Sequence, residues 1–322
     1  MPFKFVMLPP QTSATQAWAR LISDSVPESD VRIPEDEIQA RSEIVDADAA
    51  FGTLNSDMLS LANNLRWLQA PAAAPPAGYY FPELIEHPVQ ITNFREIYND
   101  HISAHILAFV LAFARGLHYY IPHQIKGEWA PRPLDTGVVH LPESTALILG
   151  VGGIGAEAAR LCSELGMRVV AIDARRKDTP PGVEQMLRPD QLDVLLPEAD
   201  FVIMTIPHTP ETEGLMNTAR FGLMKDSAFL INIGRGMTVR LDDLVTALHA
   251  GEIAGAALDV YEIEPLPNGH ALWTAPNILL TPHSAGFGPY LDDRRADLLV
   301  DNALRFSRGK TLRNVVNKSV WF

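Results

Sequence analysis

Short apolar runs, separated by polar or helical stretches, recur through the first hundred residues of the chain. The first run, at residues 3–7, predicts a short buried strand that ends at Pro9 and Pro10. Similar runs lie at residues 31–33, 49–52, 65–68 and 89–91. Residues 55–62, which begin with polar side chains, predict a short helix. Because strands that alternate with helices form parallel sheets, residues up to about 94 predict one small α/β unit.

A second series of apolar runs begins in the middle of the chain. They lie at residues 146–149, 167–173, 201–206, 228–233, 255–260 and 277–281. Near-continuous apolar strands with helices between them are typical of a doubly wound sheet that is covered on both faces. Such sheets bind ligands beyond the carboxyl ends of their strands, so we expect functional residues at those ends.

Residues 101–115 predict a long helix that is apolar on nearly every side and must be buried between units or against a partner chain. His101 and His105 have the i, i+4 spacing of metal ligands. Ile102, however, occupies the place of the glutamate in the H-E-x-x-H motif, and no third ligand is evident. We therefore expect structural histidines and no metal site. Residues 122–142, which are punctuated by prolines, predict a connector.

Composition narrows the possible functions. A length of 322 residues predicts two domains. The net charge of −13 argues against nucleic acid and acidic membranes as partners, since both favour a basic face. No apolar run is long enough to span a bilayer, and the N-terminus lacks a signal-peptide pattern. The single cysteine, Cys162, cannot form an intramolecular disulfide; it predicts a core residue and a cytoplasmic location.

A glycine turn follows the apolar run at residues 146–149. Gly150, Gly152 and Gly155 have the G-x-G-x-x-G spacing, and an Ala/Leu-rich helix begins directly after them. The first glycine allows a tight turn, the second lets the backbone approach a pyrophosphate, and the third lets helix and strand pack closely. The N-terminus of the helix then presents free N–H groups to that pyrophosphate. Strand, turn and helix together predict a dinucleotide site.

An acid ends the next apolar run and strengthens this interpretation. Asp173 lies close to the offset of about 20 residues that is expected for a ribose-binding carboxylate. A carboxylate there repels the 2′-phosphate of NADPH, whereas Arg175 and Arg176 would attract it. We expect the carboxylate to prevail and the arginines to reach solvent or stack on adenine. The predicted cofactor is therefore NADH, with NADPH as the alternative.

Three polar residues follow three further strands of the same sheet. Arg235, Glu264 and His283 lie at strand ends or in the loops beyond them. Singly, they are compatible with a surface charge, a solvated loop acid and a satisfied polar group. Their convergence on the cofactor side of one sheet favours a site.

These motifs, taken in order, resemble those of the D-isomer-specific 2-hydroxyacid dehydrogenase family over nearly the whole chain. The matching stretches are residues 150–155, 205–212, 231–236, 258–265 and 281–283. The resemblance implies an α/β fold of two Rossmann-like, doubly wound parallel-sheet domains with a cleft between them. Residues 1–98 and 288–322 would form a discontinuous, flavodoxin-like substrate domain. Residues 99–287 would form the NAD-binding domain.

The resemblance also implies roles for individual residues. Arg235, Glu264 and His283 would be catalytic, and Asp259 would lie near the nicotinamide amide. The implied cofactor contacts are Gly150, Gly152, Gly153, Ile154, Gly155, Asp173, Arg175, Ile206, Pro207, Thr212, Ile233, Gly234, Arg235, Asp259, His283 and Gly286. The implied substrate contacts are Ala73, Ala74, Arg235 and His283. Relatives carry a glycine-rich turn where residues 70–76 are alanines and prolines, which leaves the substrate open.

The chemistry of these residue types agrees with the implied reaction. One guanidinium fork can bind both the carboxylate and the carbonyl oxygen of a 2-oxo acid. A histidine can donate the proton that the developing oxyanion needs, and a neighbouring carboxylate keeps that histidine protonated and oriented. We predict reduction of a small 2-oxo acid, such as hydroxypyruvate, glyoxylate or a close relative. A cofactor-sensing, corepressor-like binding protein on the same fold is the alternative, and turnover of any 2-oxo acid discriminates between the two.

The resemblance finally implies an assembly. It places the long apolar helix at a two-fold interface, so we predict a homodimer whose contact includes Ile106, Phe109 and Phe113.

Overall fold

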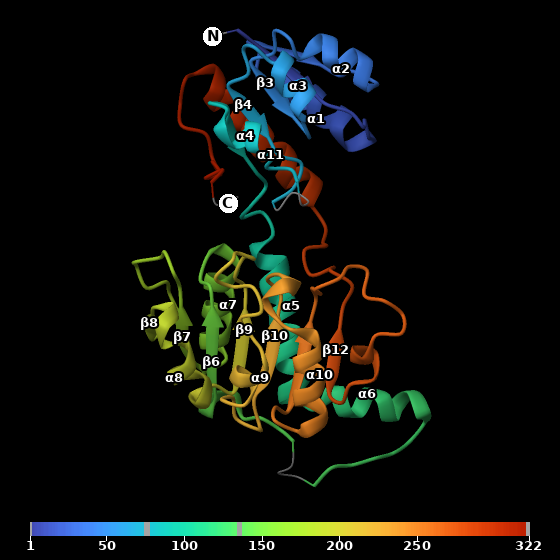
Figure 1. The fold of residues 1–322 in the computed structure, drawn as a ribbon, viewed down its shortest axis with the longest axis vertical. Coiled ribbons are helices and arrows are strands. Elements are labelled where there is room, and N and C mark those ends of the chain that lie inside the picture. The colour runs from blue at the N-terminus through green and yellow to red at the C-terminus, as the bar shows by residue number, and fades with distance from the viewer. Residues whose placement is uncertain (1, 74–77, 134–136, 320–322) are drawn as a thin grey trace. The chain divides into compact units, whose positions relative to one another are not determined.

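The computed structural model describes residues 2–73, 78–133 and 137–319, which form two compact units (Figure 1). Unit 1 comprises residues 1–97 and 289–322, and unit 2 comprises residues 98–288. Each boundary lies one residue from the predicted one. Both units are parallel-sheet α/β structures, so the predicted fold class is confirmed.

Unit 1 is built on a five-stranded parallel sheet in the order β2-β1-β3-β4-β5. Its strands are β1 (Phe3–Met7), β2 (Ser29–Arg32), β3 (Ala49–Phe51), β4 (Trp67–Gln69) and β5 (Gln90–Thr92). Its helices are α1 (Ser13–Ser25), α2 (Glu37–Glu43), α3 (Ser56–Leu61), α4 (Pro82–Glu86) and α11 (Leu291–Ser307). The ring of Phe306 lies 5.1 Å from that of Phe3 and 5.6 Å from that of Trp67. Thus α11 completes a core that the N-terminal strands begin.

Unit 2 is built on a seven-stranded parallel sheet in the order β12-β11-β10-β9-β6-β7-β8. Its strands are β6 (Thr145–Leu149), β7 (Arg168–Ile172), β8 (Gln185–Leu187), β9 (Phe201–Met204), β10 (Phe229–Asn232), β11 (Gly255–Leu258) and β12 (Ile278–Leu280). Its α-helices are α5 (Asn99–Ala114), α6 (Leu117–Lys126), α7 (Gly153–Glu164), α8 (Leu192–Leu195), α9 (Thr218–Phe221) and α10 (Leu241–Ala250). Six predicted strands match these strands within two residues at each end, while β8 was not predicted.

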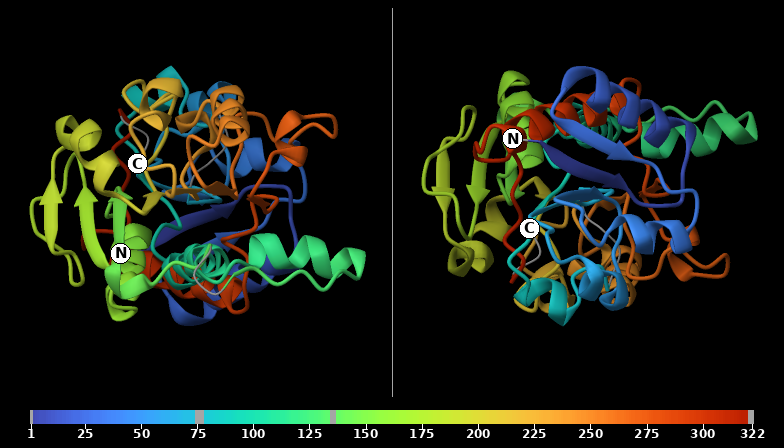
Figure 2. Two further views of the ribbon diagram at one scale, coloured as in Figure 1. Left: turned by 90° about the horizontal axis from the view of Figure 1, so that it is seen from below. Right: turned by 90° about the horizontal axis from the view of Figure 1, so that it is seen from above.

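Alternate side chains of these strands fill two separate apolar layers. Ala146 and Ile148 of β6 pack with residues of α5 and α7, while Leu147 and Leu149 pack with residues of α8, α9 and α10. The helices therefore cover both faces of the sheet, as Figure 2 also shows. Cys162 is buried in the first layer, and burial raises the pKa of its thiol to about 12, which confirms a core residue.

The apolar helix α5 is buried by its own sheet. Ile106, Phe109 and Phe113 belong to the core of unit 2, and the ring of Phe113 stacks on that of Phe229 at 4.4 Å. The prediction that these three residues contact a partner chain is therefore wrong. The α5 side chains avoid water by covering the sheet, and the helix supplies no evidence for a dimer.

The predicted connector at residues 122–142 contains helical structure. Its first residues belong to α6, which includes Pro122 and lies between Gly116 and Gly127, both in the left-handed conformation. None of the α6 side chains is buried, and the helix projects away from the sheet of unit 2 (Figures 1 and 2). Among the described residues, no single helix is long and apolar enough to cross a membrane; α5 and α6 together pass that test, but they meet at a bend of 75°.

Candidate active site

The glycine turn lies between β6 and α7, and its geometry requires glycine. Gly150 has a φ of +88°, and a Cβ atom there would lie 2.9 Å from Cγ2 of Ile206. A Cβ atom on Gly155 would collide with the carbonyl oxygen of Gly150, and one on Gly153 would lie 2.5 Å from Nδ2 of Asn99. The spacing read in the sequence therefore marks close backbone approaches.

The start of α7 suits an anion. Its N-cap residue is Gly152, and no side chain caps the helix. The first N–H groups of a helix have no partner within the helix, and the helix dipole makes this end positive. A Cβ atom on Gly152 would meet nothing within 4 Å, so the space before the helix is open. These features fit a dinucleotide pyrophosphate.

Asp173 follows β7 and holds the glycine turn. One carboxylate oxygen accepts the N–H of Val151 at 2.9 Å, and the other accepts the N–H groups of Arg175 and Arg176 at 2.8 Å each. Burial alone would raise the pKa of Asp173, but these backbone N–H groups and the charge of Arg176 lower it. The carboxylate is thus charged at neutral pH. Arg176 does not simply reach solvent as predicted: its Nη1 donates to the carbonyl oxygen of Val151 at 2.9 Å.

Other predicted cofactor residues meet at the ends of β9 and β10. A Cβ atom on Gly234 would lie 2.5 Å from the carbonyl oxygen of Ile206, so only glycine allows the two loops to approach. Oγ1 of Thr212 donates to the carbonyl oxygen of Pro207 at 2.7 Å and closes the loop after β9. Ile233 lies between Gly234 and the end of β10 and is buried.

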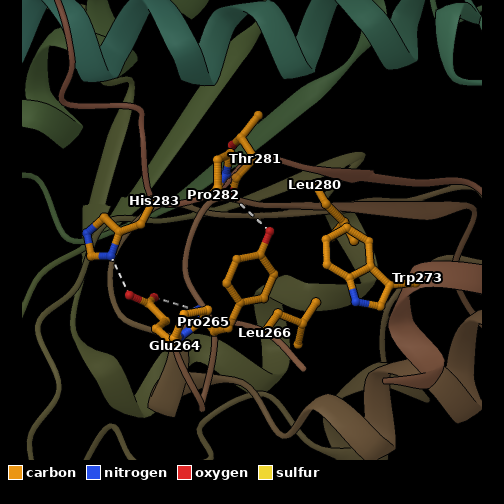
Figure 3. A pocket seen from close by; sticks show the side chains of 9 residues that line it. Glu264, Pro265, Leu266, Trp273, Leu280, Thr281, Pro282 and His283 are labelled. Atoms are coloured by element: carbon orange, nitrogen blue, oxygen red, sulfur yellow. Dashed lines mark hydrogen bonds and ion pairs between the residues drawn. The ribbon is translucent and has the colours of Figure 1, made fainter. Parts of the chain in front are cut away.

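Glu264 and His283 form a hydrogen-bonded pair. Nδ1 of His283 lies 2.6 Å from Oε2 of Glu264, and Oε1 of Glu264 accepts the N–H of Tyr261 at 3.0 Å. The carboxylate is therefore fixed from two sides. The His283 side chain is 53% exposed, and its second nitrogen, Nε2, points away from Glu264 (Figure 3).

The loop that carries His283 is tied to the end of β11 by Asp259. This residue is 2% exposed, and its carboxylate accepts bonds from Oγ1 of Thr281 at 2.6 Å, N of Ser284 at 2.8 Å and N of Ala285 at 3.0 Å. His105 bonds the same Thr281 hydroxyl at 3.0 Å, and burial lowers the pKa of its imidazole. The expected structural role of His105 agrees with these contacts.

Arg235 follows β10, and its guanidinium is largely enclosed. Nη1 donates to the carbonyl oxygen of Gly234 at 2.6 Å. Burial lowers the pKa of Arg235, and the negative charge of Glu264 acts in the opposite direction. Arg235 is therefore within electrostatic range of the Glu264–His283 pair, and the structure brings all three predicted catalytic residues to one edge of the sheet.

A cavity of about 650 Å³ lies beside this pair. It is lined by Tyr261, Glu264, Pro265, Leu266, Trp273, Leu280, Thr281, Pro282 and His283 (Figure 3). The polar groups of its aromatic walls are satisfied within the chain, since the indole N–H of Trp273 donates to Pro267 and the Tyr261 hydroxyl donates to Thr281. This cavity could not be predicted from the sequence, because its apolar residues follow no strand or helix period.

The predicted substrate loop belongs to unit 1. The carbonyl oxygen of Ala73 accepts a bond from Nδ2 of Asn93 at 2.9 Å. Ala74 lies outside the described residues. Gly286, predicted to contact the cofactor, lies in unit 2, where a Cβ atom would lie 3.6 Å from Cδ1 of Tyr98.

Comparison with known proteins identifies the family. The family model described as "D-isomer specific 2-hydroxyacid dehydrogenase, NAD binding domain" matches residues 107–285. A glyoxylate reductase of Pyrococcus horikoshii is 36% identical over 251 residues, which cover 74% of this chain and 72% of that protein. The chain belongs to the D-isomer-specific 2-hydroxyacid dehydrogenase family.

Solved structures of this family resemble the dehydrogenase over its full length. A D-isomer-specific 2-hydroxyacid dehydrogenase of Xanthobacter autotrophicus, solved with NADPH and MES, has a TM-score of 0.84 at 26% identity and covers 100% of both chains. A family protein of Aeromonas salmonicida has a TM-score of 0.78 at 28% identity, over 99% of this chain and 100% of that one. The protein is thus an NAD(P)-dependent oxidoreductase, as the sequence predicted.

Proposed function

We propose that this dehydrogenase reduces a small 2-oxo acid, such as glyoxylate or hydroxypyruvate, to the D-2-hydroxy acid. The observation that carries the proposal is the 2.6 Å contact between His283 and Glu264, within electrostatic range of Arg235. Relatives named glyoxylate reductase and hydroxypyruvate reductase, which are 36% and 34% identical, support this substrate class.

Arg235 is the proposed substrate-binding residue. Its guanidinium carries several N–H donors in one plane, which can bind the carboxylate and the carbonyl oxygen of a 2-oxo acid together. Largely enclosed by protein, this guanidinium makes electrostatic contacts that are stronger than at an exposed site. The acid is then oriented before reaction.

His283 is the proposed proton donor. Nδ1 faces the Glu264 carboxylate, so Nε2 is left to give its proton to the carbonyl oxygen as negative charge develops there. Glu264, itself held by the N–H of Tyr261, fixes the orientation of the ring. The bound nicotinamide dinucleotide supplies the hydride.

The cofactor would lie on unit 2. The N–H groups at the start of α7 would hold the pyrophosphate, and the predicted residues at the ends of β7, β9, β10 and β11 would surround the remainder. Unit 1 would then be the substrate domain, and Ala73 would contribute to substrate binding. We infer a preference for NADH, because the charged Asp173 carboxylate repels a 2′-phosphate.

The direct test is an absorbance assay that crosses NADH and NADPH with a panel of 2-oxo acids. We expect turnover of a small 2-oxo acid and a fall of about 10²–10⁴-fold in kcat for His283→Ala, the usual range for loss of a general acid. Dinucleotide binding should survive, because the pyrophosphate contacts lie elsewhere. Binding without turnover of any 2-oxo acid would contradict the proposal and favour the cofactor-sensing alternative.

We also propose a homodimer. Because α5 is buried in its own unit, the proposal is supported instead by the exposed apolar side chains of α6 and of the residues that follow it. The exposed apolar side chains there are Leu117, Tyr120, Ile121, Ile125 and Trp129. Sedimentation at micromolar concentration should give twice the monomer mass, and a monomer would contradict the proposal.

A further inference from the structure

Both backbone polar groups of Val151, the residue inside the glycine turn, are held by side chains that follow β7. The Asp173 carboxylate accepts the Val151 N–H, and the Arg176 guanidinium donates to the Val151 carbonyl oxygen, each at 2.9 Å. Val151 itself is buried. The turn after β7 therefore fixes the glycine turn at Val151, through hydrogen bonds to both its N–H and its carbonyl oxygen.

These two contacts fix two successive peptide groups. In the peptide between Gly150 and Val151, the N–H is held by Asp173, and the carbonyl oxygen accepts a bond from Oγ1 of Thr205 at 2.7 Å. In the next peptide, Arg176 holds the carbonyl oxygen of Val151. A trans peptide is planar, and its N–H points opposite to its C=O. Arg176 therefore sets the direction of the Gly152 N–H.

That N–H stands at the start of α7. Gly152 is the N-cap of the helix, and no side chain caps it. An anion at this helix end is recognised by the direction of N–H groups as well as by the dipole. A peptide free to rotate would have to be ordered at the moment of binding, which lowers affinity.

The contacts at Arg176 require a guanidinium. Nε and Nη2 donate to Oδ2 of Asp178 at 3.2 and 2.8 Å, while Nη1 donates to Val151. The planar guanidinium thus links the Val151 carbonyl group to the Asp178 carboxylate. A lysine ammonium on a flexible stem lacks this fixed fork and cannot hold both partners in one plane.

We propose that Arg176 is a positioning residue of the dinucleotide site, which orients the Gly152 N–H toward the pyrophosphate. This role rests on the proposed place of the pyrophosphate at the glycine turn. NADH and NADPH share the pyrophosphate, so Arg176 serves both alike. A residue that reads the 2′-phosphate would instead affect NADPH alone.

The test is a fluorescence titration of purified full-length protein with NADH and with NADPH. Arg176→Ala should raise both dissociation constants by a similar factor, roughly tenfold, the size expected for loss of one ordered contact. Lys177→Ala is the matched control, since it removes the same charge from an exposed position in the same turn, and it should change both constants less than about twofold. Arg176→Lys should behave like Arg176→Ala.

Further measurements separate positioning from a general loss of structure. Thermal unfolding without cofactor should show that the Arg176 variants are folded. In steady-state kinetics, these variants should raise the KM for the cofactor more than they lower kcat. Asp178→Asn weakens the contact between Arg176 and residue 178 but keeps the arginine. This variant should show an intermediate loss of dinucleotide affinity. A change for NADPH alone, equal changes in Lys177→Ala, or full rescue by lysine would each overturn the proposal. The titration needs no substrate, so a failure to reduce 2-oxo acids would leave it unaffected.

Discussion

The first strand-to-helix turn of unit 1 and that of unit 2 occupy corresponding places but begin their helices differently. In unit 1, β1 leads to α1 through a capping box: Oγ1 of Thr12 accepts the N–H of Thr15 at 3.1 Å, and Oγ1 of Thr15 accepts the N–H of Thr12 at 2.8 Å. In unit 2, β6 leads to α7 through Gly152, and no side chain caps the helix.

The difference shows that strand order alone does not create an anion site. Each turn leaves the carboxyl end of a strand in a parallel sheet and enters a helix, so the peptide dipoles are arranged alike. In α1, side chains of the chain already satisfy the helix N-terminus. In α7, no side chain caps the helix N-terminus, and Asp173, Thr205 and Arg176 fix the preceding turn through hydrogen bonds to its backbone. The cap, more than the fold, decides which turn can bind.

The largest expected effect comes from giving α7 the kind of cap that α1 has. Gly152 has extended backbone angles, and a Cβ atom there meets nothing, so Gly152→Ser fits without strain. The hydroxyl should bond an N–H of the first turn and occupy the space proposed for the pyrophosphate. We expect NADH affinity to fall roughly 10–100-fold, equivalent to about 1.4–2.8 kcal/mol, measured by fluorescence titration.

The stability of the same variant supplies the control. A serine N-cap is better than glycine by only a few tenths of a kcal/mol, so thermal unfolding without cofactor should occur at the same or a slightly higher temperature. A destabilised variant would mean that the turn was distorted. Unchanged affinity would mean that the pyrophosphate does not lie at this helix end.

Removing the support of the α7 turn should have a smaller effect. Asp173→Asn retains one carbonyl acceptor but loses charge and one of the two oxygens that accept backbone N–H groups. We expect a loss of roughly 1–2 kcal/mol of stability at pH 7. The pKa of Asp173 is lowered on folding, so its charged form stabilises the protein above the unfolded value of 3.8. That stability is lost as the pH falls through the lowered pKa.

The measurement is thermal unfolding of wild type and Asp173→Asn from pH 7 to pH 3. The difference should shrink as the pH approaches 3, and a constant difference would contradict the assigned role of the charge. The ratio of kcat/KM for NADH to that for NADPH should also fall in the variant, because the like-charge repulsion is gone. Asparagine is a better probe here than alanine, which would also release Val151.

The smallest expected effect comes from removing the cap of α1. Thr12→Ala should cost about 0.5–2 kcal/mol of stability, the usual range for an N-cap, and should leave dinucleotide affinity unchanged. Denaturant unfolding and NADH titration of one preparation check both statements. A weakened affinity would show that the turn in unit 1 also contributes to the cofactor site.

Much of the fold could be predicted because buried parallel strands are short apolar runs. β6 and β9 appear in the sequence as such runs. β8 was missed, since this short strand at the sheet edge is only partly buried and is not apolar throughout. α6 was not predicted, because the prolines of this stretch favour a connector. The glycines at 116 and 127, which flank the helix, are the signal that could have indicated it.

The candidate site was predictable where it depends on strand order. Parallel strands end at one edge of the sheet, so residues after β10, β11 and β12 had to converge. Two other features depend on the paths of loops, which no periodicity in the sequence encodes. They are the hydrogen bond from Arg176 to Val151 and the position of Trp273 in the lining of the cavity. The burial of Phe113 against Phe229 was equally hidden, because an all-apolar helix suits its own sheet and a partner alike.

The discontinuity of unit 1 has a consequence for biosynthesis. The sheet of unit 1 leaves the ribosome first, but Phe306 of α11, which covers Phe3 and Trp67, is translated about 240 residues after β4. Unit 2 is one continuous segment, and all of it is translated before α11. The apolar face of the nascent N-terminal segment therefore stays uncovered until α11 has been translated. Such a segment is prone to aggregation, and chaperones could protect it during this time.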